Sequence, residues 1–209
     1  MNLKILSKGE MMNIAILGAT GKFGRPFTAK LLANPNFYLT LLSKSAGNNY
    51  EDNYRITAKN IDATNIKELN KALENQDVVF CAVSGVDQPA IARNLVEINP
   101  KRLIYMTVVG IYNELAEDNG GEYNVDSEPE QIPNRNAVAL IEESNIDYTI
   151  LRCGYLIFGE EEDYVITKKG ETPKGYVSTS KSVEKIALEI IENPKLYSHE
   201  SISITRDMS

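Results

Sequence analysis

The chain has 209 residues, of which 43% are hydrophobic and 24% are charged, and its formal net charge is −7. This length and composition are typical of one globular domain with a full core. A negatively charged chain repels nucleic acid phosphates and anionic lipid, so we expect neither as a general partner. Apolar runs stay below the roughly 20 residues that span a membrane, and the N-terminus lacks the features of a secretory signal. We therefore expect a soluble, cytoplasmic protein.

Residues 1–12 precede the first predicted strand. A strand of the kind that follows normally starts almost at the initiator methionine, as "MNIAILG" would from Met12. We expect that translation starts at Met11 or Met12, and the alternative is a short natural extension. Either way, the predicted domain covers residues 13–209.

The hydrophobic pattern alternates between strand-like and helix-like segments along most of the chain. Strands are predicted at 14–17, 37–42, 54–62, 77–83, 102–109, 147–153 and 201–205. Helices are predicted at 22–33, 64–73, 89–98, 134–144 and 183–192. Strands that are separated by helices pair in parallel through right-handed crossovers. The sequence therefore predicts a single α/β domain, with a doubly wound parallel sheet and helices on both faces.

Local signals add detail to these elements. Residues 77–83 are almost wholly apolar, which is typical of a strand buried on both faces of a sheet. Thr64 is the predicted N-cap of helix 64–73, and Lys67 stands where a capping box would have Glu, so no box is expected. Cys81 and Cys153 lie in apolar runs, which favours buried free thiols over a disulfide.

Two segments interrupt the alternation. Residues 113–134 are acidic and rich in Gly and Pro, and residues 159–182 have the pattern of a small insertion that contains a hairpin. Long loops in compact domains are often functional lids. Both segments follow predicted strands, at the carboxyl ends where open α/β sheets bind ligands. We expect both to act as lids.

The stretch "ILGATGKFG" places Gly18, Gly21 and Gly24 between a strand and a helix. In this context Gly18 makes the tight turn, Gly21 lets the backbone approach a diphosphate, and Gly24 lets the helix pack closely. The helix N-terminus offers free N–H groups to the phosphates. The pattern predicts a dinucleotide site, and the alternative is a glycine-rich turn without a ligand.

The end of strand 37–42 indicates which dinucleotide binds. An acidic residue there would bind the ribose of NAD, whereas a cation accepts the 2′-phosphate of NADP. The chain has Ser43, Lys44 and Ser45 and no carboxylate at this point, and Arg25 offers a second cation. The sequence therefore favours NADP(H) over NAD(H). The alternatives are that Lys44 is a solvated loop lysine and Arg25 a helix-surface arginine.

Motifs along nearly the whole chain, from about residue 13, resemble one family. They are "GATGKFG", "DVVFCAVSG", "MTVVGIYNE", "NIDYTILRCGYL" and "VSTSKSVEKIALEII". Together they resemble the NAD(P)H-binding, atypical short-chain dehydrogenase/reductase family, in the branch similar to biliverdin reductase B/flavin reductase and to NmrA-like proteins. The resemblance implies a Rossmann fold and a role in binding or oxidising NAD(P)H.

The resemblance also implies which residues contact the dinucleotide. Asp62 and Ala63 match the pair beside the adenine, and residues 82–84 match the segment along the ribose. Cys153 and Gly154 stand beside the nicotinamide, where "RPG" or "RPA" is usual, and the proline is absent here. The full implied set is Gly18, Thr20, Gly21, Lys22, Phe23, Ser43, Lys44, Asp62, Ala63, Ala82, Val83, Ser84, Thr107, Cys153 and Gly154.

The Tyr–Lys pair of many short-chain dehydrogenases, in which Lys lowers the pKa of a proton-transferring Tyr, does not carry over. Gln131 and Arg135 stand near the expected positions. The only Tyr-xxx-Lys is Tyr164–Lys168, in a β-branched stretch that is typical of a strand. Residues four apart are roughly 13 Å apart in a strand, against about 6 Å along a helix. Alcohol oxidation by that mechanism is therefore disfavoured.

Hydride transfer to a planar small-molecule acceptor, such as a flavin, a quinone or a biliverdin-like molecule, needs no such pair. Thr107 is a candidate to hydrogen-bond the acceptor or the nicotinamide, and Tyr112 to stack on the acceptor or donate a proton. Tyr155 is a candidate to line the pocket. The alternatives are a strand-end hydroxyl bonded to backbone for Thr107, and core packing for Tyr112 and Tyr155.

Other functions remain open in the sequence. A non-catalytic, NmrA-like protein that senses the dinucleotide would lack the Tyr–Lys pair equally well. Sugar-nucleotide epimerase or dehydratase chemistry needs that pair and a larger substrate domain, so it is disfavoured. His199 has no Cys or acidic residue at ligand spacing, so no metal site is expected. The protein is expected to be a monomer or a homodimer.

Overall fold

The computed structural model of the protein describes residues 11–208. The expectation about the start of translation falls largely on residues 1–10, which lie outside the described residues. Within residues 11–208, Met12 already belongs to the first strand, and its side chain is buried in the core. The folded domain thus includes one residue more than the predicted start at residue 13.

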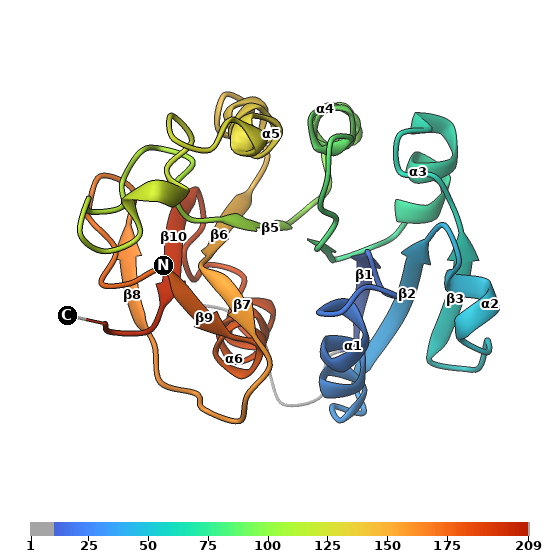
Figure 1. Ribbon diagram of the computed structural model, residues 1–209. Coiled ribbons are helices and arrows are strands. Elements are labelled where there is room, and N and C mark those ends of the chain that lie inside the picture. The colour runs from blue at the N-terminus through green and yellow to red at the C-terminus, as the bar shows by residue number, and fades with distance from the viewer. Residues whose placement is uncertain (1–10, 209) are drawn as a thin grey trace, which may run out of the picture.

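An eight-stranded sheet forms the centre of the molecule, in the order β3-β2-β1-β4-β5-β6-β10-β8 (Figure 1). Its strands are β1 Met12–Leu17, β2 Phe37–Ser43, β3 Ile56–Asn60, β4 Val78–Cys81, β5 Leu103–Val108, β6 Tyr148–Cys153, β8 Val165–Lys168 and β10 Glu200–Thr205. All neighbours are parallel except β10 and β8. The strand order reverses between β1 and β4, the point at which doubly wound sheets bind ligands.

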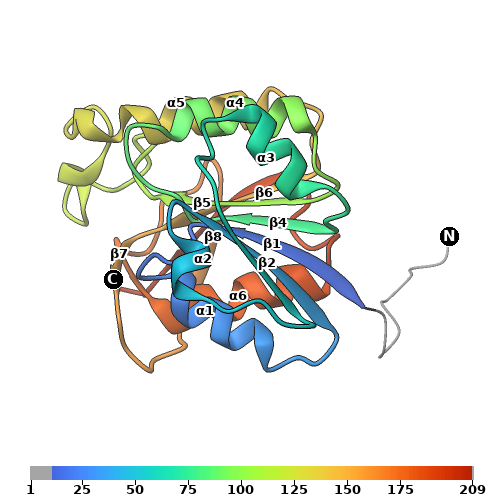
Figure 2. The same ribbon diagram turned by 90° about the vertical axis from the view of Figure 1, so that its right-hand side faces the viewer.

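Helices cover both faces of the sheet (Figure 2). One face carries α1 Gly24–Leu32 and α6 Ser180–Glu192, and the other carries α3 Ile66–Leu73, α4 Gln88–Ile98 and α5 Ile132–Glu142. Each face has its own apolar core, one built around Phe27 and Phe80 and the other around Tyr105 and Ile141. The predicted single-domain, doubly wound Rossmann fold is confirmed.

Helix α3 begins one residue later than the cap prediction allowed. Its N-cap is Asn65, whose side chain accepts hydrogen bonds from the N–H groups of Lys67 and Glu68. The prediction that Thr64 caps this helix is wrong, because Asp62 Oδ1 accepts from both the N–H and the hydroxyl of Thr64 in a turn ahead of the helix. With Asn65 as the cap, the third helical position is acidic, because it is Glu68. The Glu68 carboxylate accepts a hydrogen bond from the Asn65 side-chain amide at 2.9 Å.

The segment 159–182 contains no hairpin. Its first strand, β8, joins the edge of the main sheet antiparallel to β10. Its second strand, β9 Val177–Thr179, pairs in parallel with β7 Tyr155–Ile157 in a separate two-stranded sheet. The segment does contain two strands, as a hairpin would require. Each of them, however, pairs with a strand outside the segment and not with the other. The expectation for Lys168 holds, since it lies in a strand, and its ammonium pairs with Glu200 at 2.7 Å.

Neither cysteine of the described chain forms a disulfide. Cys81 and Cys153 are free thiols with buried side chains, as predicted. Over residues 11–208, the structure contains no helix that is long and apolar enough to cross a membrane.

Candidate functional site

Two cavities lie along the carboxyl edge of the sheet. The first, of about 350 Å³, is here called the glycine-loop cavity. It is lined by Leu17, Gly18, Thr20, Gly21, Leu42, Ser43, Lys44, Ile61, Asp62, Ala63, Ala82, Val83, Ser84, Asp87 and Ile91. The second, of about 410 Å³, is here called the β5–β6 cavity. It is lined by Met106, Thr107, Val108, Val109, Tyr123, Glu128, Gln131, Cys153, Gly154, Tyr155, Leu156 and Tyr176.

The two cavities belong to one edge because the strands that carry them are neighbours in register. Leu17 at the end of β1 pairs with Cys81 at the end of β4, and Cys81 pairs with Tyr105 of β5. Val108 at the end of β5 in turn pairs with Cys153 of β6. A long ligand that crosses the switch point between β1 and β4 can therefore reach both cavities.

Gly18 and Gly24 shape the turn out of β1. Gly18 has a φ of +85°, and a Cβ there would lie 2.8 Å from the carbonyl oxygen of Ala82, so both its conformation and the approach of β4 require glycine. A Cβ on Gly24 would overlap the carbonyl oxygen of Gly18 and lie 2.9 Å from Ala19 Cα. Gly24 therefore lets α1 start directly against the loop.

The loop leaves backbone donors free. The N–H groups of Thr20, Lys22 and Phe23 form no hydrogen bond with any residue of the described chain, whereas Gly21 N–H bonds the carbonyl of Gly18 at 2.9 Å. Free N–H groups at a helix start, together with the helix dipole, attract anions. The arrangement suits a diphosphate.

Phe23 and Lys22 do not line the cavity. The Phe23 ring is buried between Phe27 and Phe80, with ring centroids 5.3 Å and 5.8 Å away, and the Lys22 side chain is exposed. The Phe23 ring therefore completes the core under α1, and the implied match of Phe23 to the dinucleotide loop stays a prediction. Any contact of these two residues with a ligand at the loop comes from their N–H groups.

The β2 end of the cavity carries paired polar groups. The Thr20 hydroxyl donates to the Ser43 hydroxyl at 3.0 Å, and Lys44 Nζ lies 3.7 Å from Asp62 Oδ2. Hydrogen bonds from the Thr64 N–H and hydroxyl, and then the charge of Lys44, lower the pKa of Asp62. Lys44 is thus a solvent-exposed cation that faces a carboxylate of the same cavity.

Arg25 is turned toward this end as well. Its Nε donates to the carbonyl of Thr20 at 2.9 Å, and its Nη2 donates to Asn49 Oδ1 at 2.7 Å, on the short helix α2 Ala46–Asn49. These two bonds hold the guanidinium between the glycine loop and the segment after Ser45. A second cation therefore stands at the rim near Lys44.

Five lining residues were not expected from the sequence: Leu17, Leu42, Ile61, Asp87 and Ile91. Ile61 follows β3, and Asp87 and Ile91 lie at the start of α4, across the cavity from β2. The sequence signal was available, since Ile91 belongs to the apolar face of helix 89–98. The expected residues Asp62, Ala63 and 82–84 gather at the same cavity, and their part in binding stays a prediction.

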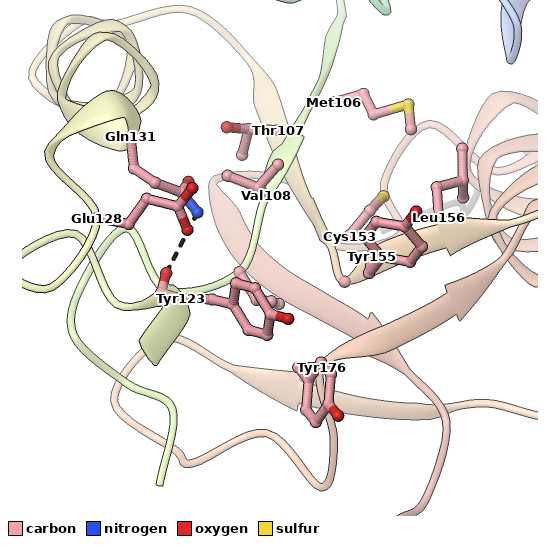
Figure 3. Close-up of a pocket in the computed structure, with 12 residues that line it drawn as sticks. Met106, Thr107, Val108, Tyr123, Glu128, Gln131, Cys153, Tyr155, Leu156 and Tyr176 are labelled. Atoms are coloured by element: carbon pink, nitrogen blue, oxygen red, sulfur yellow. Dashed lines mark hydrogen bonds between the residues drawn. The ribbon is translucent and has the colours of Figure 1, made fainter. Parts of the chain in front are cut away.

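The β5–β6 cavity is largely apolar and aromatic, with a few polar groups (Figure 3). Thr107 is only 5% exposed, and its hydroxyl finds no hydrogen-bond partner among the described residues. The alternative that this hydroxyl bonds the backbone is therefore wrong. A buried unpaired hydroxyl on a cavity wall is rare, because leaving it unpaired costs about 1–3 kcal/mol.

The structure explains why Cys153 and Gly154 suit their positions at the end of β6. Burial raises the pKa of the Cys153 thiol to about 12, so the thiol is neutral at physiological pH. A Cβ on Gly154 would lie 2.7 Å from the backbone nitrogen of Val177, and the Gly154 N–H donates to Ser178 Oγ at 2.7 Å. Glycine is needed there so that β7 and β9 meet beside the cavity.

Tyr112 lies away from both cavities. Its hydroxyl bonds Glu142 Oε1 at 2.7 Å and Ser201 Oγ at 3.0 Å, and Arg152 and Lys169 stand over its ring. Burial and the neighbouring Glu142 raise its pKa. The candidate role of Tyr112 as a stacking group or proton donor is corrected here: the chain turns after β5 and packs this ring against the sheet under α5.

The side chains of Gln131 and Arg135 lie in different places. Gln131 lines the β5–β6 cavity, and its amide donates to the carbonyl of Tyr123 at 3.2 Å (Figure 3). Arg135 lies at the surface, 3.9 Å from Asp126. Of the two residues near the expected Tyr–Lys positions, only the first reaches the cavity.

Several cavity residues were missed by sequence reasoning. They are Met106, Val108, Val109, Tyr123, Glu128, Leu156 and Tyr176. The rings of Tyr123 and Tyr176, from the two long loops, lie 5.3 Å apart. Tyr155 lines the cavity as expected, but it is 70% exposed, so core packing does not explain it.

The chain matches one protein family over most of its length. The model of the NAD(P)H-binding family matches residues 18–194, which include the glycine loop and strands β2 to β9. The chain belongs to the NAD(P)H-binding family. Within it, the chain is an NAD(P)-binding protein of the atypical short-chain dehydrogenase/reductase type, as the motifs indicated.

Relatives extend over nearly the whole chain. The UPF0659 protein YMR090W of Saccharomyces cerevisiae is 29% identical, over 87% of this chain and 86% of its own. A Rossmann-fold NAD(P)-binding family protein from Shigella flexneri has a TM-score of 0.81 at 26% identity, with 96% of each chain covered. A short-chain dehydrogenase/reductase from Veillonella parvula, solved in complex with NADP, has a TM-score of 0.78 at 26% identity, over 94% of this chain and 95% of its own.

Proposed function

We propose that the protein is an NADP(H)-dependent reductase that transfers hydride to a planar acceptor such as a flavin or a quinone. The observation that carries this proposal is the hydroxyl of Thr107, which is buried and unpaired on the wall of the β5–β6 cavity. The carboxyl end of β5, which carries Thr107, lies next to the end of β4, which lines the glycine-loop cavity. A dinucleotide held at the loop would extend toward that hydroxyl.

The glycine-loop cavity would hold the adenosine and diphosphate part of the coenzyme. Free N–H groups of Thr20, Lys22 and Phe23 would bind the diphosphate. Lys44 and Arg25 offer positive charge to a 2′-phosphate, and the Ser43 hydroxyl, which accepts from the Thr20 hydroxyl, lines the same cavity. This donor set favours NADP(H) over NAD(H).

The β5–β6 cavity would hold the reacting ring and the acceptor. Bound NADPH supplies the hydride. Apolar groups such as Met106 and Leu156, with the rings of Tyr155 and Tyr176, would exclude water and hold a flat acceptor in place. Thr107 would donate a hydrogen bond to the acceptor or to the carboxamide of the nicotinamide. A proton needed by the reduced acceptor can come from solvent at the cavity mouth.

A dinucleotide sensor without catalysis is the second candidate. Its support is that the Tyr–Lys pair of related dehydrogenases is absent. Gln131 and Arg135 stand near the expected positions, and Arg135 pairs with Asp126 at the surface. Neither side chain is a proton donor of suitable acidity at neutral pH.

One pair of experiments separates the candidates. Calorimetric titration with NADP+ and NAD+ measures the coenzyme preference, and NADPH oxidation is followed at the nicotinamide absorbance with menadione and with riboflavin. The reductase predicts tighter binding of NADP+ and acceptor-dependent oxidation. Tight NADP+ binding without oxidation across a panel of acceptors would favour the sensor, and equal affinity for NAD+ would defeat the assignment of the 2′-phosphate site.

A further inference from the structure

The β5–β6 cavity has an unbalanced charge. Its lining contains one carboxylate, from Glu128, and no Lys, Arg or His. Resting on the proposed function, we propose that this cavity accepts electrically neutral planar acceptors and that Glu128 selects against acceptors that carry a phosphate or carboxylate. The same ring system would thus be reduced in its neutral form and disfavoured in its anionic form.

Glu128 is held in position by its loop. Its N–H donates to the carbonyl of Asn124 at 2.8 Å, and the side chain of Asn124 bonds both the N–H and the carbonyl of Leu115, at 3.0 Å and 2.9 Å. The turn that carries Glu128 is therefore fixed by backbone hydrogen bonds. These bonds place the Glu128 backbone at the wall of the cavity.

The carboxylate itself is uncompensated. It forms no hydrogen bond or ion pair with another residue of the described chain. Figure 3 draws Glu128, Gln131 and Thr107 along the wall of one cavity. A charged acceptor that reaches Thr107 therefore enters the same cavity as this carboxylate.

Three guanidinium groups of this half of the sheet are paired with carboxylates. Arg135 faces Asp126 at 3.9 Å, and Arg206 pairs with Glu161 at 2.9 Å. Arg152, beneath the sheet end, is fully buried and pairs with Glu114. None of these guanidinium groups lines the cavity, so an anionic acceptor would find no counter-charge there.

The energy of this mismatch is large enough to select between acceptors. An anion that enters a largely apolar cavity loses hydration without gaining an ion pair. Two like charges about 10 Å apart at an effective dielectric constant near 20 repel by an energy that corresponds to at least about tenfold in binding or rate. A neutral ring escapes both costs.

Riboflavin and FMN form the decisive pair of probes, because they share the isoalloxazine ring and differ by one phosphate. The experiment measures kcat/KM for both with NADPH, and their dissociation constants by flavin fluorescence on protein saturated with NADP+. We expect riboflavin to exceed FMN at least about tenfold in both measurements. In Glu128→Gln the FMN-to-riboflavin ratio should rise about tenfold, and high salt should narrow the difference in the unmodified protein.

The matched control is Glu117→Gln, which removes the same charge from the same loop at an exposed position outside the cavity lining. It should leave the FMN-to-riboflavin ratio unchanged. Equal or better use of FMN, an unchanged ratio in Glu128→Gln, or no binding of either flavin would overturn the inference. If the inference fails but the same samples oxidise NADPH with menadione, the proposed function still stands. If no acceptor is reduced but riboflavin still binds more tightly than FMN by the expected ratio, only the proposed function is defeated.

Discussion

Lys44 Nζ lies 3.7 Å from Oδ2 of Asp62, and both side chains line the glycine-loop cavity. A 2′-phosphate that binds Lys44 must therefore compete with a carboxylate of the same protein. Because hydrogen bonds from Thr64 lower the pKa of Asp62, this competitor is charged over the whole neutral and mildly acidic range. We expect this pair to influence the balance between the two coenzymes.

We expect Lys44→Met to weaken NADP+ binding about fivefold, since an exposed charge pair contributes about 1 kcal/mol. NAD+ binding should stay unchanged, because NAD+ has no 2′-phosphate. Calorimetric titration of both coenzymes measures this. Lys71→Met, at an exposed position on α3, removes the same charge away from the cavity and serves as control. Parallel weakening of both coenzymes in Lys44→Met would refute the assignment.

Gly24→Ala should destabilise the fold and weaken coenzyme binding together. The new Cβ would overlap Gly18 O and stand 2.9 Å from Ala19 Cα, so α1 or the loop must shift. Overpacking of this kind costs about 1–3 kcal/mol in the free energy of unfolding, which urea denaturation measures. Gly159→Ala is the control, since a Cβ there meets nothing within 4 Å. A variant as stable as the control would show that the loop tolerates a side chain.

Thr107→Val separates function from stability. The hydroxyl has no partner to lose, so the free energy of unfolding should stay the same or rise. Acceptor-dependent NADPH oxidation should fall roughly threefold to tenfold, the effect of one hydrogen bond. Thr28→Val is the structural counterpart, because the Thr28 hydroxyl donates to the Gly24 carbonyl at 2.7 Å, and its loss should cost about 1 kcal/mol. Undiminished oxidation by Thr107→Val would argue against contact with the reactants.

The two thiols should be unreactive in the folded protein. Burial raises the pKa of both Cys81 and Cys153 to about 12. In the unfolded chain each thiol ionises near its ordinary value, so above that pH the unfolded state binds fewer protons and the free energy of unfolding falls as pH rises toward 12. A disulfide reagent at pH 8 should label neither thiol in buffer and both in urea. Rapid labelling in buffer would contradict this burial.

The sequence was sufficient for the parallel strands and for the glycine loop, because both follow from local patterns. Strand-like segments separated by helix-like segments predicted the parallel strands, and three glycines between a strand and a helix predicted the turn out of β1. The pairing of β8 with β10, and of β7 with β9, was not predictable in this way, since each joins segments that are distant along the chain.

The acceptor side of the site was less accessible to sequence reasoning for the same reason. Glu128 and Tyr123 reach the β5–β6 cavity because their loop folds back on Gly110, where Val125 N–H donates to the Gly110 carbonyl at 2.9 Å. No periodic pattern encodes that contact. Tyr112 was misplaced because the direction of a side chain after a turn depends on partners such as Glu142 and Ser201.

The buried pair of Arg152 and Glu114 ties the beginning of the 113–134 loop to the middle of the sheet. Glu114 also accepts from the N–H of Tyr112 at 2.9 Å, so the anchor extends into the backbone. Opening this anchor would leave the buried Arg152 guanidinium without its counter-charge. The beginning of the loop is therefore anchored to β6, and we expect an acceptor that binds in the β5–β6 cavity to lose little affinity to the ordering of this segment.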